Sequence, residues 1–406
     1  MRNRTSVPSR STATLSTVDG DLIVERYAII KGTGTPPTVQ VTGSVHCEGH
    51  NTLECSLSAE NIEAEESITV QGDLDLRGEV VAEDGRLEVH GNLRATRVDV
   101  DDALYVGKDL TADEVDVGGL LDISGNVTAH EIDVGGSVRV SGKAKTDDVD
   151  VGGSLMIESE ADISSLNTGG TVRVNGGRIS EIDVGGSFES KGPLAFEEID
   201  VGGTVRLTGQ NHGGEVEVGG TLEVNGDLAF DKIDVGGRVE ITGSAEGKAL
   251  EVGGKVQING SLKLSGSLEV GGKVSVGKEA TAANMEVGGR LQAEEITVER
   301  RIEVGGSITT EHGVTAAFVE IGKHGEIQGP VRAEEVLIGR DARAGTIQAK
   351  RIILQNGSSA ENVYGENITV ESHVQVTGEI LYTNELWMGQ HVVLSKPPMK
   401  VDKLPP

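Results

Sequence analysis

The chain has 406 residues with 58 Gly, 9 Pro, 2 Cys and only 2% aromatic residues, so ordinary globular domains, whose cores depend on leucine and aromatic side chains, are not expected. Scarce proline without a strict Gly-X-Y pattern excludes collagen, and regularly placed Val and Ile argue against disorder. The net charge of −29 argues against nucleic acid as a main partner and against broad adhesion to anionic lipid, because both are negatively charged.

Residues 1–20 are predicted to form a flexible basic tail, because Arg2, Arg4 and Arg10 precede the first acidic residue. The segment has no apolar region that would make it a secretory signal, and no run of 18 apolar residues occurs in the chain. Two cysteines give no disulfide framework. These features favour a cytoplasmic protein whose only route to a membrane is this tail.

Residues 21–97 are predicted to form irregular coils of the repeat described below. They include the sequence VHCEGHNTLEC, whose His46, Cys47, His50 and Cys55 are weak candidates for zinc ligands. The spacing matches no standard zinc site, and Cys47 falls at an inward position, where a buried thiol is ordinary packing. We therefore expect a structural role for this cluster, and no bound cofactor.

Residues 98–340 contain a regular repeat. Segments such as IDVGGSVRV (132–140) and IDVGGTVRL (199–207) place a Val before a double glycine. From Val100 to Ile338 this position moves 238 residues in 14 steps, or 17 residues per step. Such a period indicates one structural unit stacked on itself.

Each repeat, numbered from that Val as position zero, has three pairs of apolar residues, at −2 and 0, +4 and +6, and +10 and +12. Pairs two apart are typical of strands. The glycines at +1, +2 and often +8 are predicted to supply the positive φ that tight corners need. Seventeen residues over three sides predict a triangular parallel β-helix, right-handed by the usual rule for parallel crossovers. Phe196 and Phe230, both at +12, are expected to fill the core.

The residue at −1 points outward and is acidic in 13 of the 14 repeats from Val100 to Ile321. Stacking would place these carboxylates about 4.8 Å apart, where each neighbouring pair costs about 0.9 kcal/mol in water before screening. Cations at +3 are expected to offset part of this repulsion. The column is either a solvated face that keeps the protein soluble or a stripe that binds cations or a partner. Its members are Asp99, Asp116, Asp133, Asp150, Asp183, Asp200, Glu217, Asp234, Glu251, Glu269, Glu286, Glu303 and Glu320, with Asn167 as the exception, and the cations at +3 are Arg238, Lys255, Lys273 and Arg290.

Residues 341–395 continue the repeat irregularly, and the Pro-containing segment 396–406 is predicted to be a flexible tail. The solenoid would then cover 21–395, with roughly 21 coils and a length of about 100 Å. Its ends would expose unpaired strand edges, so each must be capped or paired with another copy. The residues expected to cap the ends or to form contacts between copies are Ile23, Tyr27, Ile29, Ile30, Leu381, Tyr382, Leu386 and Trp387.

The chain shows no strong catalytic constellation. Its histidines recur in no column, and coils of nearly constant length leave no long loops from which a cleft could be built. We therefore do not expect an enzyme.

The repeats IDVGGSVRVSG (132–142), IDVGGTVRLTG (199–209) and VEVGGTLEVNGDL (216–228), flanked by short polar tails, resemble those of the bactofilins, the polymer-forming cytoskeletal proteins. The resemblance covers about residues 39–394. It implies a right-handed β-helix that polymerises end to end, without nucleotide, into filaments that act as scaffolds for cell shape or for other proteins, sometimes at the membrane. Because this chain has many more coils than a compact bactofilin domain, a rod that acts as a spacer by itself is an alternative.

The expected function is thus a non-enzymatic structural scaffold whose partner is a second copy of itself, together with the proteins that it positions. Two alternatives remain open from the sequence: a cell-surface, adhesin-like solenoid and, less favoured, a β-helix enzyme that acts on polysaccharide. A cleaved N-terminus or surface labelling would indicate the first, and protruding, non-repeating carboxylates on one face would favour the second.

Overall fold

The computed structural model describes residues 3–405, and the chain falls into two compact units, Met1–Gly202 (unit 1) and Gly203–Pro406 (unit 2). The described residues form strands and turns, with no helix, and make about 23 turns that lie about 17 residues apart. The prediction of an all-β parallel β-helix is therefore confirmed, whereas the predicted number of roughly 21 coils is slightly too small. Among the described residues there is no helix long and apolar enough to cross a membrane.

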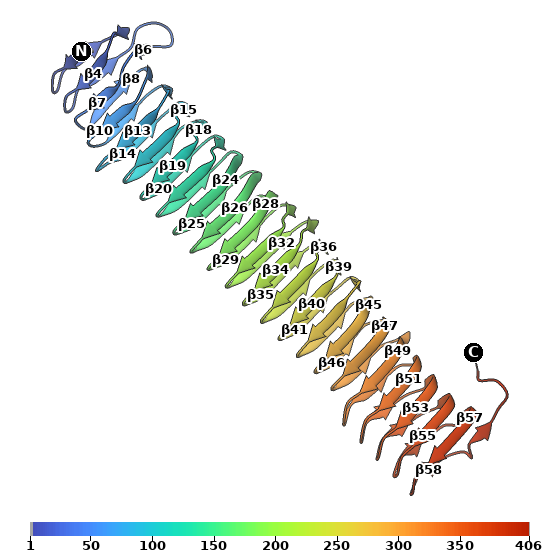
Figure 1. The fold of residues 1–406 in the computed structure, drawn as a ribbon. Helices are drawn as coiled ribbons and strands as arrows, with labels where there is room; N and C mark the ends of the chain where they lie inside the picture. Colours follow the sequence, from blue (N-terminus) through green and yellow to red (C-terminus); the bar gives the residue numbers. More distant parts are fainter. Residues whose placement is uncertain (1–2, 406) are drawn as a thin grey trace. The chain divides into compact units, whose positions relative to one another are not determined.

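Within each unit a turn contributes strands to three separate stacks, and each strand pairs in parallel with its equivalents in the neighbouring turns. In unit 1, for example, β16 (Arg97–Val100), β17 (Ala103–Val106) and β18 (Leu110–Thr111) form one turn. Figure 1 shows successive strands of one unit lying side by side. In the more tightly joined turns the third strand continues round the corner into the first strand of the next turn, as in β24 (Ala144–Val151).

In unit 1 the three stacks run from the first turn to Val201. The first stack contains β1 (Arg4–Val7), β4 (Asp21–Val24), β7 (Val45–Cys47), β10 (Ile62–Ala64), β13 (Glu79–Ala82), β16, β19 (Glu114–Val117), β22 (Glu131–Val134) and β31 (Glu198–Val201). The second contains β2 (Thr12–Thr14), β5 (Ile29–Lys31), β8 (Asn51–Glu54), β11 (Ile68–Val70), β14 (Arg86–Val89), β17, β20 (Leu120–Ile123), β23 (Ser137–Val140), β25 (Ser154–Ile157), β27 (Thr171–Val174) and β29 (Ser187–Ser190). The third contains β3 (Thr17–Val18), β6 (Thr38–Val41), β9 (Ser56–Ala59), β12 (Leu74–Leu76), β15 (Leu93–Arg94), β18, β21 (Val127–Thr128) and β30 (Leu194–Ala195), and the bent strands β24, β26 (Ala161–Thr168) and β28 (Gly177–Val184) join the third stack to the first.

Unit 2 has the same three stacks, with more bent strands. Its second stack contains β32 (Thr204–Thr208), β35 (Thr221–Asn225), β38 (Arg238–Ile241), β41 (Lys255–Ile258), β44 (Lys273–Val276), β46 (Arg290–Gln292), β48 (Ser307–Thr309), β50 (Glu326–Gln328), β52 (Arg343–Ala344), β54 (Ser359–Ala360), β56 (Gln375–Val376) and β58 (Val393–Leu394). The first stack begins with β34 (Glu215–Val218), β37 (Lys232–Val235), β40 (Ala249–Val252) and β43 (Ser267–Val270), and the third with β33 (Asn211–His212), β36 (Leu228–Ala229), β39 (Ala245–Gly247) and β42 (Leu262–Leu264). Both continue in the bent strands β45 (Glu279–Val287), β47 (Glu295–Val304), β49 (Gly313–Ile321), β51 (Val331–Ile338), β53 (Ile347–Leu354), β55 (Val363–Val370) and β57 (Ile380–Met388), and β59 (Met399–Lys400) ends the third stack.

The core of each unit consists of apolar columns that run from turn to turn. In β19, Val115 and Val117 are fully buried, while Asp116 between them points outward. The register places Val115 between Val98 and Ile132 of the neighbouring turns, so that β-branched side chains stack on one another. Burying one such side chain contributes roughly 1.5–3 kcal/mol. The two-residue period predicted from the sequence therefore builds the core directly.

The two phenylalanines at position +12 lie in the core, as predicted. Phe196 is 6% exposed and Phe230 is 5% exposed. In unit 2 the Phe230 ring extends over Gly247 of the next turn, and a Cβ on Gly247 would overlap that ring. A large side chain in one turn is thus accommodated by a missing side chain in the next.

The double glycines at +1 and +2 are not needed for a positive φ, which was the predicted reason for them. Positive φ angles occur at glycines such as Gly176 and Gly209, but at none of the described Gly-Gly pairs that follow position zero. The corners instead stack closely: a Cβ on Gly254 would overlap the carbonyl oxygen of Gly237 one turn earlier, and a Cβ on Gly272 would overlap that of Gly254. Glycine is required there because neighbouring backbones leave no room for a side chain.

Turns near the chain ends replace the Gly-Gly corner with a longer corner. There a non-glycine residue takes a positive φ, of 59° at Tyr27, 48° at His50, 61° at His373 and 56° at His391. The side chains at these corners follow one another from turn to turn, and the rings of His373 and His391 stack with centroids 5.1 Å apart.

Both segments predicted to be tails contain paired strands, which corrects two boundaries. β1 pairs along its whole length with β4, and β2 and β3 pair with β5 and β6, so the solenoid begins near residue 4 instead of 21. At the other end, β59 pairs with β57. A terminal strand edge carries unpaired backbone donors and acceptors, and the adjoining polar segment satisfies them although it has no repeat pattern. Arg2 lies outside the described residues.

Candidate functional site

The structure separates the four residues considered as zinc ligands. Cys47 and Cys55 are buried free thiols, and burial raises the pKa of Cys47 to about 12. His46 and His50 lie on the outside, where each faces a glutamate side chain; the distance from His46 Nδ1 to Glu63 is 3.4 Å. Among the described residues, no group of three or more His, Cys, Asp or Glu side chains is arranged to hold a metal ion. The thiols and imidazoles thus face opposite sides of the backbone.

The acidic residues at −1 stack in register in both units. In unit 1, Asp116 is paired with Asp99 and Asp133 in the adjacent turns, and Asn167 lies between Asp150 and Asp183. Desolvation raises the pKa of Asp116, and the two neighbouring carboxylates raise it further. The register in unit 2 joins Glu217, Asp234, Glu251, Glu269, Glu286, Glu303 and Glu320 in the same way.

The cations at +3 form a column of their own. Arg238, Lys255, Lys273 and Arg290 stack in register, yet no ion pair among the described residues joins them to the acids at −1. Lys255 Nζ instead donates a hydrogen bond to Gln257 Oε1 at 2.9 Å. The acids that do have a basic partner find it at position −3, as Glu320 does with Arg301 at 2.8 Å. Among the described residues the +3 cations thus make no direct ion pair with the acidic column, and the expectation that they offset part of its repulsion stays a prediction.

The predicted N-terminal contact residues lie in the second turn and are largely covered. Ile30 is fully buried and pairs with Ala13 of the first turn. Tyr27 is 50% exposed, but the Arg10 guanidinium lies over its ring at 5.7 Å and the His50 ring contacts it at 5.3 Å. The other two residues, Ile23 and Ile29, are half-buried. The sequence pattern missed the first turn, which covers this surface.

The C-terminal end carries most of the exposed large hydrophobic side chains of the described residues. Exposed large hydrophobic side chains are Tyr27, Trp387, Met388, Val393 and Met399, and four of these five lie between residues 387 and 399. Of the residues predicted for this end, Trp387 is 57% exposed, Tyr382 and Leu386 are half-buried, and Leu381 is buried.

Two different causes leave these side chains exposed. Met388 pairs with Val370 and occupies the inward position zero, but it belongs to the last strand of its stack, so no further turn covers it. Trp387 pairs with Thr369 and occupies position −1, which carboxylates fill in the regular turns. Val393, which pairs with Gln375, likewise replaces a polar outward residue. Large apolar residues at outward positions were the signal by which the sequence could have identified this surface.

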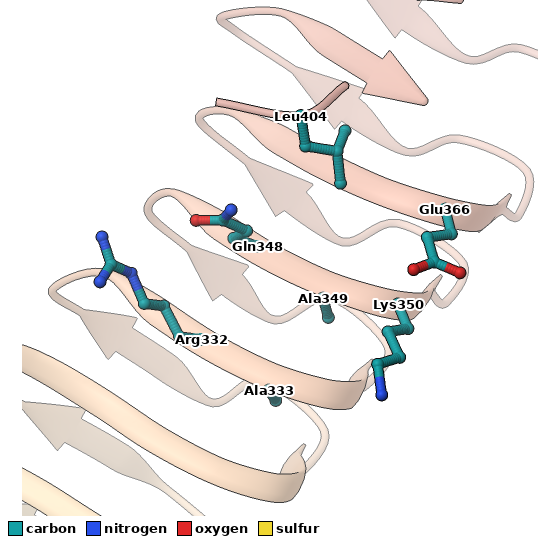
Figure 2. A pocket seen from close by; sticks show the side chains of 7 residues that line it. All are labelled: Arg332, Ala333, Gln348, Ala349, Lys350, Glu366 and Leu404. Atoms are coloured by element: carbon teal, nitrogen blue, oxygen red, sulfur yellow. The ribbon is translucent and has the colours of Figure 1, made fainter. Parts of the chain in front are cut away.

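After the last turn the chain folds back over unit 2. Val401 N donates a hydrogen bond to the Tyr382 carbonyl at 2.9 Å, and Gln348 Nε2 donates one to the Pro405 carbonyl at 2.8 Å. Figure 2 shows Leu404 in front of β55, the strand that carries Glu366, and next to the turn that carries Gln348. Beneath it is a hollow of about 330 Å³, lined by Arg332, Ala333, Gln348, Ala349, Lys350, Glu366 and Leu404.

The fold makes this chain a β-solenoid repeat protein. No protein-family model, curated protein or solved structure matches it. The surfaces of the chain that indicate a function are chiefly the apolar C-terminal end and the hollow beneath residues 401–405.

Proposed function

We propose that this protein is a structural scaffold that associates with copies of itself through the ends of its solenoid and that its role is not enzymatic. The proposal follows the resemblance of its repeats to those of the bactofilins. A cytoplasmic location is part of the proposal. The partner is a second copy, with other proteins held along the filament.

The observation that carries this proposal is that four exposed large apolar side chains, Trp387, Met388, Val393 and Met399, all belong to the last turn and the segment that follows it. Isolated exposed apolar side chains are normal on soluble proteins, whereas several gathered at one place indicate a contact surface. Here Trp387 and Met388 lie on the part of β57 that follows Tyr382, where β59 does not pair with it and where the backbone groups of a final strand favour pairing with another strand. Apolar burial and strand pairing would thus act at the same end.

The test replaces the two most prominent side chains, in the variant Trp387→Ser with Met388→Ser. Wild-type protein, without nucleotide, is expected to form assemblies larger than a monomer in sedimentation velocity and filaments in negative-stain electron microscopy. The variant should associate about thirtyfold more weakly, which corresponds to about 2 kcal/mol for the loss of a central aromatic contact.

The control is Tyr105→Ser, which removes a half-buried aromatic residue from an outward position of β17, away from the end. It should associate as the wild type does. Wild-type protein that stays monomeric at every concentration would overturn the proposed function, and equal weakening by both variants would show that the contact does not involve the C-terminal end.

A further inference from the structure

We propose that the hollow on β51 and β53 is a docking groove for residues Val401–Pro405 of a second copy, which occupy it when two copies exchange their C-terminal segments. The inference rests on the proposed function, because it requires the copies to meet at their C-terminal ends. It specifies which surface of one copy, the groove, binds which segment of the other copy, residues 401–405.

The groove has the chemistry of a peptide site. Ala333 and Ala349 line it with small apolar side chains, which leave room for the branched Leu404 side chain. The Gln348 amide donates its hydrogen bond to a backbone carbonyl, that of Pro405. Proline has no backbone N–H, so at this residue the ligand offers only an acceptor, and the groove supplies the matching donor.

The segment that lies on the groove makes few contacts and can therefore detach from it. Val401, Leu404 and Pro405 are half-buried, whereas Asp402 and Lys403 are exposed. The connection from Ser395 to Pro398 is mostly exposed, and β59 pairs with β57 through only two residues. The few contacts to be broken on opening therefore contribute little free energy, as is usual for terminal segments.

Exchange would re-form the same contacts between two copies. In an exchanged pair each groove holds an identical segment, so the contact free energy is nearly unchanged and protein concentration decides the outcome. Residues 396–405 are ten residues, which reach about 33 Å when extended. The segment now turns back over two turns, a distance of about 10 Å, so it is long enough to reach a copy seated against the last turn.

Charge attracts the segment toward another copy but does not hold it in the groove. The segment contains Lys396, Lys400 and Lys403 against a single acid, Asp402, while the whole chain has a net charge of −29. A basic segment is attracted to the acidic body of any copy, whereas the groove itself carries Arg332 and Lys350 beside Glu366.

The experiment traps the segment and the groove with a disulfide. One chain carries Leu404→Cys and a second, differently tagged chain carries Gln348→Cys; the native Cys47 and Cys55 are buried and remain unreactive. The two chains are mixed at the concentration at which wild-type protein associates, oxidised mildly, alkylated, and examined on a non-reducing gel. In parallel, sedimentation velocity measures whether the mixture associates.

The control chain carries Thr315→Cys instead of Gln348→Cys. Thr315 lies in the same column of paired residues two turns earlier, is exposed, and does not line the hollow. We expect a mixed disulfide dimer between the Leu404→Cys and Gln348→Cys chains, at least tenfold more abundant than with the control chain.

Association without the mixed dimer would overturn tail exchange and leave the proposed function intact. A disulfide that forms only within one chain, when both cysteines are placed in it, would also overturn exchange, because it would show a tail that stays on its own groove. Absence of both association and mixed dimer would overturn the proposed function and this inference together.

Discussion

At the scale of single residues, the close approach of neighbouring corners predicts that one added methyl group is destabilising. In Gly254→Ala the new Cβ would overlap the Gly237 carbonyl oxygen, while the adjacent Gly253 N–H is held in a hydrogen bond of 3.0 Å to the previous turn. We expect the free energy of unfolding to fall by about 1–3 kcal/mol, measured by urea denaturation. Gly345→Ala is the control, because its Cβ would meet no atom closer than 3.4 Å. Equal losses in both variants would contradict the close-approach explanation.

The acidic column offers a reciprocal pair of substitutions at the same scale. Asp116→Asn removes repulsion from two neighbours and should raise the free energy of unfolding by about 1 kcal/mol at low salt. Asn167→Asp should lower it by a similar amount, because it inserts a carboxylate between Asp150 and Asp183. Urea denaturation at low and high salt measures both. Differences that persist unchanged in high salt would show that the effect is not charge repulsion.

The raised pKa of Asp116 gives these measurements a defined pH dependence. Since the folded state holds the proton more tightly than the unfolded state does, ionisation of Asp116 destabilises the fold as the pH rises through its folded-state pKa. The advantage of Asp116→Asn should therefore be present at neutral pH and disappear below the usual value of 3.8. An advantage that is constant across this range would contradict the assignment.

At the scale of the strand and the turn, the pairing of Phe230 with Gly247 predicts energetic coupling between successive turns. Gly247→Ala would drive a methyl group into the Phe230 ring and should cost about 1–3 kcal/mol. In a Phe230→Leu background the ring is gone, so the same substitution should cost less. A double-mutant cycle by urea denaturation measures the coupling, expected at about 0.5–3 kcal/mol. Additive effects would show that the two turns pack independently.

How much of this could be predicted from the sequence depends on how far each feature repeats. The columns of Val, Ile and carboxylates were predictable because a period of 17 fixes which residues become neighbours, as with Asp99 and Asp116. Contacts that occur only once in the structure could not be predicted in this way. The hydrogen bond from Gln348 to Pro405 joins residues 57 apart, outside any repeat. The Gly-Gly corners were recognised for the wrong reason, because a sequence shows that a side chain is missing but not which neighbouring atom excludes it.

At the scale of the whole molecule, net charge and the apolar end act against each other. A charge of −29 makes copies repel, and the acidic columns distribute that repulsion along both units. The proposed contact at Trp387 and Met388 depends on apolar burial, which salt does not screen. Added salt should therefore weaken the repulsion and leave the attraction in place.

Self-association should consequently become several-fold stronger as salt rises. The Debye length falls from about 30 Å at 0.01 M to about 8 Å at 0.15 M, which shortens the range of repulsion between approaching acidic bodies. Sedimentation velocity across this series measures the effect. The variant Trp387→Ser with Met388→Ser should show a much smaller dependence of association on salt, because it lacks the apolar contact that attracts two copies. Association that weakens with salt would instead point to a contact made by opposite charges. The first surfaces to examine would then be the lysines of the C-terminal segment and the column of Arg238, Lys255, Lys273 and Arg290.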